Sequence, residues 1–520
     1  MKKNSNFIPC ILAILITHAA IAQELQILNS GTLYVSSKGS LHVNNDIQVT
    51  ATGNLIISSD VSNSGSLIVT GNTAGDITYE RHIPTDKFHL VSAPVANQNI
   101  ETFFNNAAND ISTSGTGNYG ISEYVNTNDQ GLRWQYYNTS SIGAADSFTN
   151  GKGYSNKRDA AGLYSFKGAM ASEDVSFLMT APGTHNWNSL GNPFPSFLTI
   201  NTLAQNTTSA NSNLLADNID NLDTNFSALY LWDGTAYIPF NLSSTVAASL
   251  APGQAFMVNA KSDNTLFTFK ETTQTNGLLT PQLFYKAAST ATPEIIVRLS
   301  NGSQVKNTTL KFFDTTTKGL DKGYDAGTFA SDANAFSLDT HLVSNSEGIN
   351  FTLQCLPIAD FKETAVSLAV TAPANQTLSF SAAALNLPED VNVFLEDKDT
   401  HTVTNITNAT YSTTTTAALN GIGRFYISSS ENVLSTEDAT AFNGFTMYTT
   451  NNTNLRIAGS QQKGTATVAL YSILGTKIAT YSFKMEAIND IALPKNLATG
   501  VYIVQLIAAG AKQTKKIIIE

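Results

Sequence analysis

The sequence predicts an almost all-β chain of several domains, on three observations. Its 520 residues are too many for one hydrophobic core. Charged residues make up 13%, about half the usual share, and the Asn, Thr, Ser and Gly that replace them favour turns and exposed strand faces over helix interiors. Short apolar runs separated by Gly, Pro, Asn and Asp recur along the chain, which is typical of β-sandwiches.

Residues 1–22 have the features of a signal peptide. Two lysines stand near the start, an apolar run covers 7–16, and Ala20 and Ala22 mark a small-residue cleavage site before Gln23. The apolar run is too short for a spanning helix, and no later run approaches the roughly 18 apolar residues that such a helix needs. We therefore expect an exported mature chain without a transmembrane segment.

Cleavage at that site would leave Cys355 as the only cysteine. Each domain must then be held together by apolar burial, because no intramolecular disulfide can form. Cys355 lies within an apolar run, which predicts a core residue and not a catalytic thiol.

Residues 23–75 repeat a short unit that consists of a turn glycine, a polar residue and a strand with alternating apolar residues. The unit occurs at 31–35, 39–43, 53–57 and 65–69. Such units cannot bury a face alone, but they can when stacked. We expect three or four rungs of a short β-solenoid, with a β-meander as the alternative because the spacing is irregular.

Two β-sandwich modules are predicted next, a sandwich or jelly roll over residues 76–277 and a second sandwich over 278–431. A polar linker, 432–440, leads to a last segment, 441–520, whose size suits a small immunoglobulin-like sandwich of seven strands. This segment carries eight Lys or Arg and three Asp or Glu, a charge of +5 in a chain with a net charge of −11. The asymmetry suggests a tail with a separate role, and the acidic remainder argues against a nucleic acid partner.

Three runs in this tail, 468–477, 497–504 and 515–519, carry a family resemblance. Their motif residues are Tyr471, Gly475, Lys477, Gly500, Tyr502, Lys515 and Lys516. Together they resemble the type A C-terminal sorting domain of the type IX secretion system of Bacteroidetes, although residues 443–448 replace the Pro-Asn-Pro motif that often opens it. The resemblance implies export by the type IX machinery, removal of the tail, and release or attachment to surface lipopolysaccharide.

The preceding region, most of residues 76–430, is similar to β modules that are common in flavobacterial secreted proteins. The similarity rests on short motifs such as residues 92–95, 187–195 and 423–426. It implies no activity.

No pattern predicts catalysis, a cofactor or a metal site, since the histidines are scattered and no nucleophile elbow occurs. The glycines of the run 115–120 lack the flanking strand and helix of a dinucleotide site, so a loop is predicted. Asp217, Asp220 and Asp223, with Asn218, Asn221 and Asn225, form the densest cluster of side-chain oxygens, at a spacing unlike that of an EF-hand loop. A solvated loop is predicted there, with calcium binding as the alternative.

Aromatic residues are the remaining clue to a ligand. Alternation places Trp134 with Tyr136 on one strand face and Tyr230 with Trp232 on another. Such clusters serve core packing first, and stacking against sugar rings is the functional alternative.

The sequence therefore predicts a non-enzymatic, adhesin-like protein that reaches the outer-membrane surface or the medium by way of the periplasm. Its expected partners are the type IX machinery and glycans, surface lipopolysaccharide or other cells. A secreted polysaccharide-active enzyme, a carbohydrate-binding accessory protein and a purely structural stalk are the alternatives.

Deletion of residues 441–520 should leave the chain in the periplasm, because the export address would be lost while the signal peptide still acts. Cell fractionation and surface proteolysis measure the outcome. Normal surface delivery of the truncated chain would refute the sorting prediction.

Overall fold

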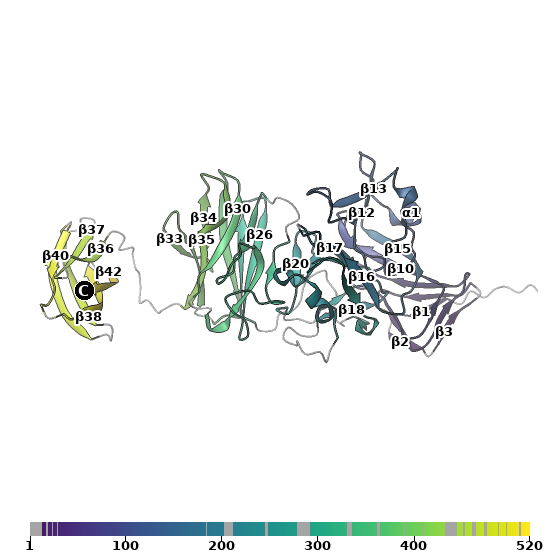
Figure 1. Ribbon diagram of the computed structural model, residues 1–520, viewed down its shortest axis with the longest axis horizontal. Helices are drawn as coiled ribbons and strands as arrows, with labels where there is room; N and C mark the ends of the chain where they lie inside the picture. The colour runs from purple at the N-terminus through teal and green to yellow at the C-terminus, as the bar shows by residue number, and fades with distance from the viewer. Residues whose placement is uncertain are drawn as a thin grey trace, which may run out of the picture. The chain divides into compact units, whose positions relative to one another are not determined.

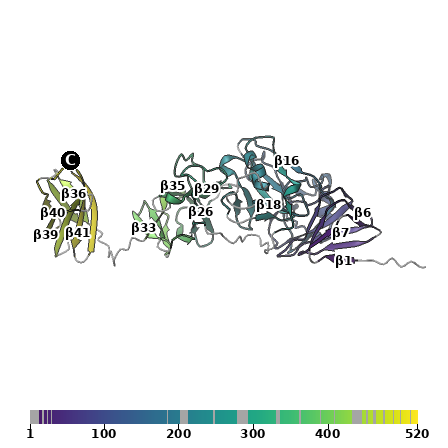
Figure 2. The same ribbon diagram turned by 90° about the horizontal axis from the view of Figure 1, so that it is seen from below.

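In a computed structural model of the chain, strands dominate and the described helices are short (Figures 1 and 2). The structure describes residues 13–431 and 445–519, apart from 17–18, 23, 29, 184, 202–211, 245–247, 278–291, 330–334, 361–363, 389–390, 408, 451–452, 460–463, 473–475, 487, 496 and 509–510. The predicted linker 432–440 lies outside the described residues. Two compact units are present, Met1–Glu431 and Asn432–Glu520. Across the described ranges, no helix has the length and apolar character needed to cross a membrane.

The chain begins with a three-sided parallel coil, coloured purple in Figure 1. Its first side holds β1 (Ala13–Ile16), β4 (Thr32–Val35) and β7 (Asn54–Ser58), its second β2 (Ala19–Ala22), β5 (Ser40–Val43) and β8 (Ser66–Val69), and its third β3 (Leu25–Ile27), β6 (Ile47–Val49) and β9 (Thr73–Ala74). Parallel partners such as Thr32 and Asn54, or Ser40 and Ser66, lie one full turn of the coil apart. The four glycine units therefore make up only two rungs, and each of these rungs contains one unit on its first side and one on its second side. The sequence alone suggests one rung for each unit.

Part of the predicted signal peptide belongs to this coil. The strand β1 pairs with β4, and β2, which contains Ala20 and Ala22, pairs with β5. Cleavage after Ala22 stays a prediction. Cleavage there would remove β1 and β2, and the edges of β4 and β5 that pair with them would lose their partners.

Four strands form a sheet over this coil, and further sheets complete the region 76–277. The first side of the coil continues through β10 (Asp76–Ile83) into antiparallel β15 (Gly162–Ala169). The facing sheet has β11 (His89–Val91), β14 (Tyr154–Asn156), β12 (Asn118–Tyr124) and β13 (Trp134–Asn138). The others are β16 (Val175–Met179) with β23 (Thr265–Phe269); β17 (Trp187–Gly191), β22 (Ala255–Asn259), β19 (Leu229–Trp232) and β20 (Tyr237–Phe240); and β21 (Ala248–Leu250), β18 (Phe197–Asn201) and β24 (Gln274–Thr275).

Short helices connect these strands. They are α1 (Ile100–Asn105), α2 (Leu214–Asn218) and the 3₁₀ turns η1 (Ala107–Asn109), η2 (Ile142–Ala144), η3 (Ile219–Asn221), η4 (Thr224–Phe226), η5 (Glu271–Thr273) and η6 (Ile358–Asp360). Asparagine caps both α-helices, since Asn99 accepts from the backbone N–H of Thr102 and Asn213 from that of Ala216. This is the usual way to satisfy a free N–H group at a helix start.

One large curled sheet forms the region 292–431. Its strands, in spatial order, are β33 (Thr402–Asn405), β32 (Val391–Asp397), β35 (Leu419–Glu431), β30 (Val366–Ala372), β28 (Ser337–Thr340), β29 (Phe351–Pro357), β26 (Val305–Phe313), β25 (Glu294–Ser300), β31 (Thr377–Leu385) and β34 (Tyr411–Thr414), with β27 (Ala326–Gly327) beside β29. The sheet curls until its ends meet, because Ile406 donates to Val393 O on β32 and accepts from Ala382 N on β31.

Hydrophobic packing crosses the predicted module boundaries at residues 75 and 277. One core cluster joins coil residues such as Val43 to Phe103 and Phe166. Another joins Trp187 to Phe329. The three predicted modules therefore pack as one unit in this structure.

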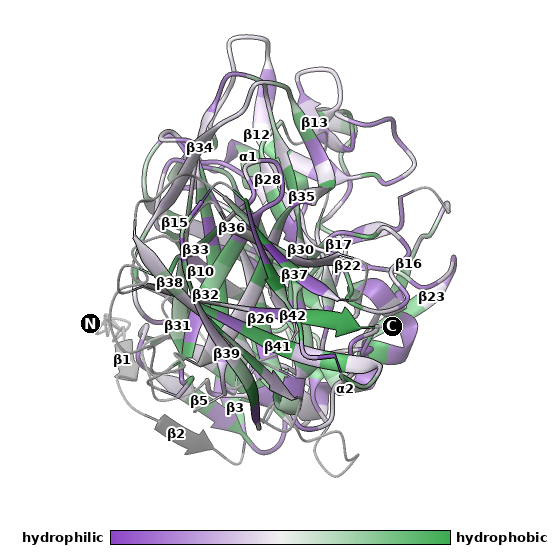
Figure 3. Ribbon diagram, turned by 90° about the vertical axis from the view of Figure 1, so that its left-hand side faces the viewer, coloured by the Kyte–Doolittle hydropathy of each residue, from purple (hydrophilic) through white to green (hydrophobic). Residues whose placement is uncertain are grey.

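The second unit is a separate two-sheet sandwich. One sheet holds β36 (Phe445–Thr450), β37 (Asn454–Gly459) and β40 (Ile488–Ala492), and the other holds β39 (Lys477–Lys484), β38 (Thr465–Ser472), β41 (Gly500–Ala508) and β42 (Ala511–Ile519). Figure 3 shows the hydrophobic end of β42. The second unit has a hydrophobic core of its own, which includes Val468, Val504 and Ile517.

Replacement of Gly53 by alanine should destabilise the coil. A Cβ atom at Gly53 would lie 2.4 Å from the backbone oxygen of Ile27, so stacked rungs would have to move apart, at a cost of about 1–3 kcal/mol. Thermal unfolding of the full chain measures the effect. The matched control is Gly115→Ala, where an added Cβ meets nothing within 4 Å. Equal midpoints for the two variants would show that the rung spacing tolerates the extra atom.

Candidate functional site

Trp134 and Tyr136 lie on one face of β13, as alternation predicts. Both are half-buried. Trp134 pairs across the sheet with Tyr124, and their rings meet edge to face at 4.9 Å between centroids. Tyr136 meets the edge of Phe88 at 5.8 Å. Each ring is thus fixed on one side by another ring and keeps part of its surface exposed.

Tyr230 does not belong to an exposed stacking surface. It is fully buried, and its hydroxyl donates to the backbone oxygen of Gly327 at 2.7 Å. Burial raises the pKa of this phenol well above its usual value. Tyr230 therefore serves core packing, the first of the two roles that the sequence allowed, and not ligand stacking, because this face of β19 is turned into the core.

Trp232, two residues along the same strand, lies where that face reaches the surface. Its side chain is half-buried and packs against Tyr237 of β20 at 4.9 Å between ring centroids. Tyr237 rests in turn on Phe329 at 4.2 Å. Burial raises the pKa of Tyr237, so its hydroxyl stays protonated.

These rings share one packed cluster, which we call the aromatic cluster. Its buried members include Tyr124, Trp187, Tyr230 and Phe329, and its half-buried members include Trp134, Phe226, Trp232, Tyr237 and Tyr324. Trp187 stands at its centre, with ring centroids 4.8 Å from Tyr230 and 4.5 Å from Phe329. The sequence gives no sign that Tyr124, Trp187 and Phe329 belong to this cluster, because they come from segments far apart in the chain.

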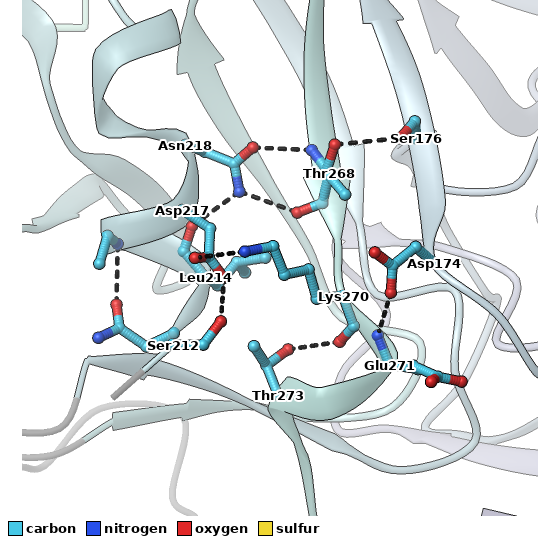
Figure 4. Close-up of polar contacts among 12 residues, drawn as sticks. Asp174, Ser176, Ser212, Leu214, Asp217, Asn218, Thr268, Lys270, Glu271 and Thr273 are labelled. Carbon is cyan, nitrogen blue, oxygen red and sulfur yellow. Dashed lines mark hydrogen bonds and ion pairs between the residues drawn. The ribbon is translucent and has the colours of Figure 1, made fainter. Parts of the chain in front are cut away.

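The carboxylates considered for calcium contact other groups of the protein. Asp217 binds Lys270 Nζ at 2.9 Å and accepts from Ser212 Oγ at 2.6 Å (Figure 4). Asp223 caps η4, and Asp220 pairs with Lys322 at 2.5 Å. Within the ranges that the structure describes, no group of three metal-ligating side chains is present.

Asp325 is the most perturbed carboxyl group of the region. It is buried, and its two oxygens accept from the backbone N–H groups of Cys355 and Asp321, each at 2.6 Å. Burial, and then the nearby Asp321, raise the pKa of Asp325 to about 7. Cys355 beside it is fully buried, as predicted for a core residue, and burial raises the pKa of its thiol well above the usual range. Asp325 and Cys355 are both closed to solvent, and the Cys355 thiol stays protonated.

One motif residue of the tail, Tyr502, serves its core. Tyr502 is buried, and its hydroxyl donates to the backbone oxygen of Ala498 at 2.7 Å. Gly500 opens β41. In contrast, Lys477, Lys515 and Lys516 are exposed and Tyr471 is half-buried. Gly475 lies outside the described residues.

Two family models match the chain. The first, described as a domain of unknown function (DUF8693), covers residues 3–428. The chain belongs to the DUF8693 family. The match runs without a break through the coil and both predicted sandwich modules. No curated protein matches the DUF8693 chain.

The second model is described as a secretion system C-terminal sorting domain and covers residues 449–520. It lies within the second compact unit. This DUF8693 protein therefore carries a type IX sorting domain, which implies a Bacteroidetes source and export to the cell surface or the medium. The prediction of a type IX sorting tail is confirmed, whereas the signal peptide and the passage through the periplasm stay predictions.

The stability of this DUF8693 protein should depend on the protonation of Asp325. Its pKa in the folded chain, about 7, is above the ordinary value of 3.8. Its contribution to stability is therefore fully present below pH 4 and is lost as the pH rises through 7. The difference between the two pKa values corresponds to about 4 kcal/mol. Thermal unfolding of the wild type and of Asp325→Asn, compared between pH 4 and 8, measures it. A difference between the two chains that stays constant across this range would contradict the prediction.

Proposed function

We propose that the DUF8693 region is a non-catalytic binding module that works outside the cell and takes glycans at its aromatic cluster. The observation that carries the proposal is the pair of half-buried tryptophans, Trp134 and Trp232, which both pack onto that cluster. They come from different sheets, so a ligand that touched both would bind a surface made only by folding.

The chemistry suits a sugar. An aromatic ring held by its neighbours offers a flat apolar face at little entropic cost. Trp134 is held by Tyr124, and Trp232 by Tyr237. Apolar C–H faces of pyranose rings pack on such surfaces, while polar groups at the edges set orientation.

A secreted polysaccharide-active enzyme is the alternative function. It would need two accessible carboxyl groups at a cleft, one of them with a raised pKa. Burial raises the pKa values of both Asp325 and Asp339, but both are buried, and both oxygens of Asp325 bind backbone N–H groups. Asp397 is likewise buried and forms a bidentate ion pair with Arg424 at 3.0 and 2.8 Å. None of these three buried groups could act as the acid or base, which favours binding over hydrolysis.

The site of action follows from the export route. A chain delivered to the surface can act as an adhesin towards other cells or matrix, and we propose attachment to lipopolysaccharide as one way of holding it there. Many weak glycan contacts presented on a cell surface add up to firm adhesion, because linked sites bind with a high effective concentration.

Glycan-array binding by the full chain tests the proposal. Trp134→Ala and Trp232→Ala should each weaken binding about tenfold, because a ring contact contributes roughly 0.5–1.5 kcal/mol beyond its area and about 1.4 kcal/mol is tenfold. The matched control is Tyr426→Ala, a half-buried ring on β35 outside the aromatic cluster. Equal losses in all three variants, or release of reducing sugar from the array glycans, would contradict the proposal.

A further inference from the structure

Strand alternation divides the tail motifs between two faces of one sheet. Leu470, Tyr502, Val504 and Ile517 point into the core and are buried. Their neighbours along the strands, Tyr471, Ile503 and Lys516, must point to the other face. The first set explains why the tail folds. The second set contributes nothing to the core and needs another explanation.

The sheet register places these outward residues in a single row. Tyr471 on β38 pairs with Ile503 on β41, and Ile503 pairs with Lys516 on β42. On the other side, Tyr471 pairs with Lys477 of β39 just past a shift in register, which brings Lys477 and not Ile478 opposite Tyr471. The four positions therefore lie side by side across the sheet, and we call them the Lys477–Lys516 row. With strands about 4.8 Å apart, its two ends lie roughly 14 Å from each other.

The row has an apolar centre and a positive charge at each end. Lys477 Nζ lies 5.7 Å from the centroid of the Tyr471 ring, and Lys516 is exposed. Ile518, next on the same face of β42, is 55% exposed and pairs with Val501. A small independent domain gains nothing by exposing these apolar residues, and such a patch usually marks an interaction surface.

Neither lysine of the row has a carboxylate partner among the described residues, whereas Arg456 and Asp490, on the other sheet, form an ion pair at 2.7 Å. The positive charge of the row is thus available to a partner. A second copy is a poor partner, because two such rows would bring lysines against lysines.

We propose that the Lys477–Lys516 row is the surface by which the sorting domain docks on an acidic, partly apolar surface of the type IX export machinery. Carboxylates of that partner meet the two lysines, and its apolar side chains cover Tyr471 and Ile503. The inference rests on the export route and not on glycan binding, so each can fail without the other.

Charge reversal of the row tests the proposal in the full chain. The double variant Lys477→Glu/Lys516→Glu, expressed in a bacterium with a type IX system, should accumulate in the periplasm. The exported fraction should fall at least about tenfold, since charge-assisted contacts turn into repulsion at both ends. Fractionation and surface proteolysis measure the fraction, and thermal unfolding of the purified chains shows whether the tail still folds.

The matched control is Lys484→Glu/Lys495→Glu. Both lysines are exposed in the same domain, the change in net charge is identical, and Lys484 lies about 20 Å along the sheet from the row. Normal export of this control together with retention of the row variant supports the proposal. Export of the row variant at the control's level overturns it, and so does equal retention of both, which would mean that net charge is recognised and not this surface.

A milder variant keeps the proposal testable if the charge-reversal variant does not fold. Lys477→Gln/Lys516→Gln removes the charges without adding repulsion, and exposed polar substitutions of this kind usually change stability little. It should fold and still be retained. Normal export of the folded glutamine variant would equally overturn the proposal.

Discussion

The packing of Trp187 against Tyr230 and Phe329 is the contact on which the rest of the DUF8693 region depends. Phe329 lies just after β27 of the large curled sheet, while Trp187 and Tyr230 come from a sheet that precedes it in the chain. The hydrogen bond from Tyr230 to the backbone oxygen of Gly327 ties the same two parts together. No disulfide is present in the part of the chain that the structure describes, where Cys355 is free. Burial of such rings must therefore hold the unit together.

The same packing makes the candidate binding surface. Trp232 and Tyr237 lie at the margin of the aromatic cluster. Their orientation is set by the contact of Tyr237 with the buried Phe329. A ring fixed in this way loses little freedom when a ligand arrives. In the tail, the two faces of one sheet have different roles: Val504 packs in the core, and its neighbour Ile503 faces outward. Both sites thus use surfaces that are rigid because their reverse side is buried.

Much of the local structure was predictable. The all-β class followed from composition and from short alternating runs, and the strands predicted in the units at 31–35 and 39–43 correspond to β4 and β5. The independence of the tail followed from its motifs and charge. The stacking order of the coil was not predictable, because the glycine units at 31 and 39 look alike in sequence but occupy different sides. For a related reason the sequence left the role of Tyr230 open between core packing and stacking, since alternation says that it shares a face with Trp232 but not which face is covered.

The sequence by itself determined the strand class, the export signal and the alternation that sorts each strand into two faces, because these depend on residues close together in the chain. Only the tertiary structure decided which face is buried, which distant rings meet Trp187, and that Lys477 and Lys516 end one row. Those outcomes depend on strand register and on contacts between segments far apart in the chain. A shift of one residue in the pairing of β41 and β42 would turn Lys516 from the outer face towards the core.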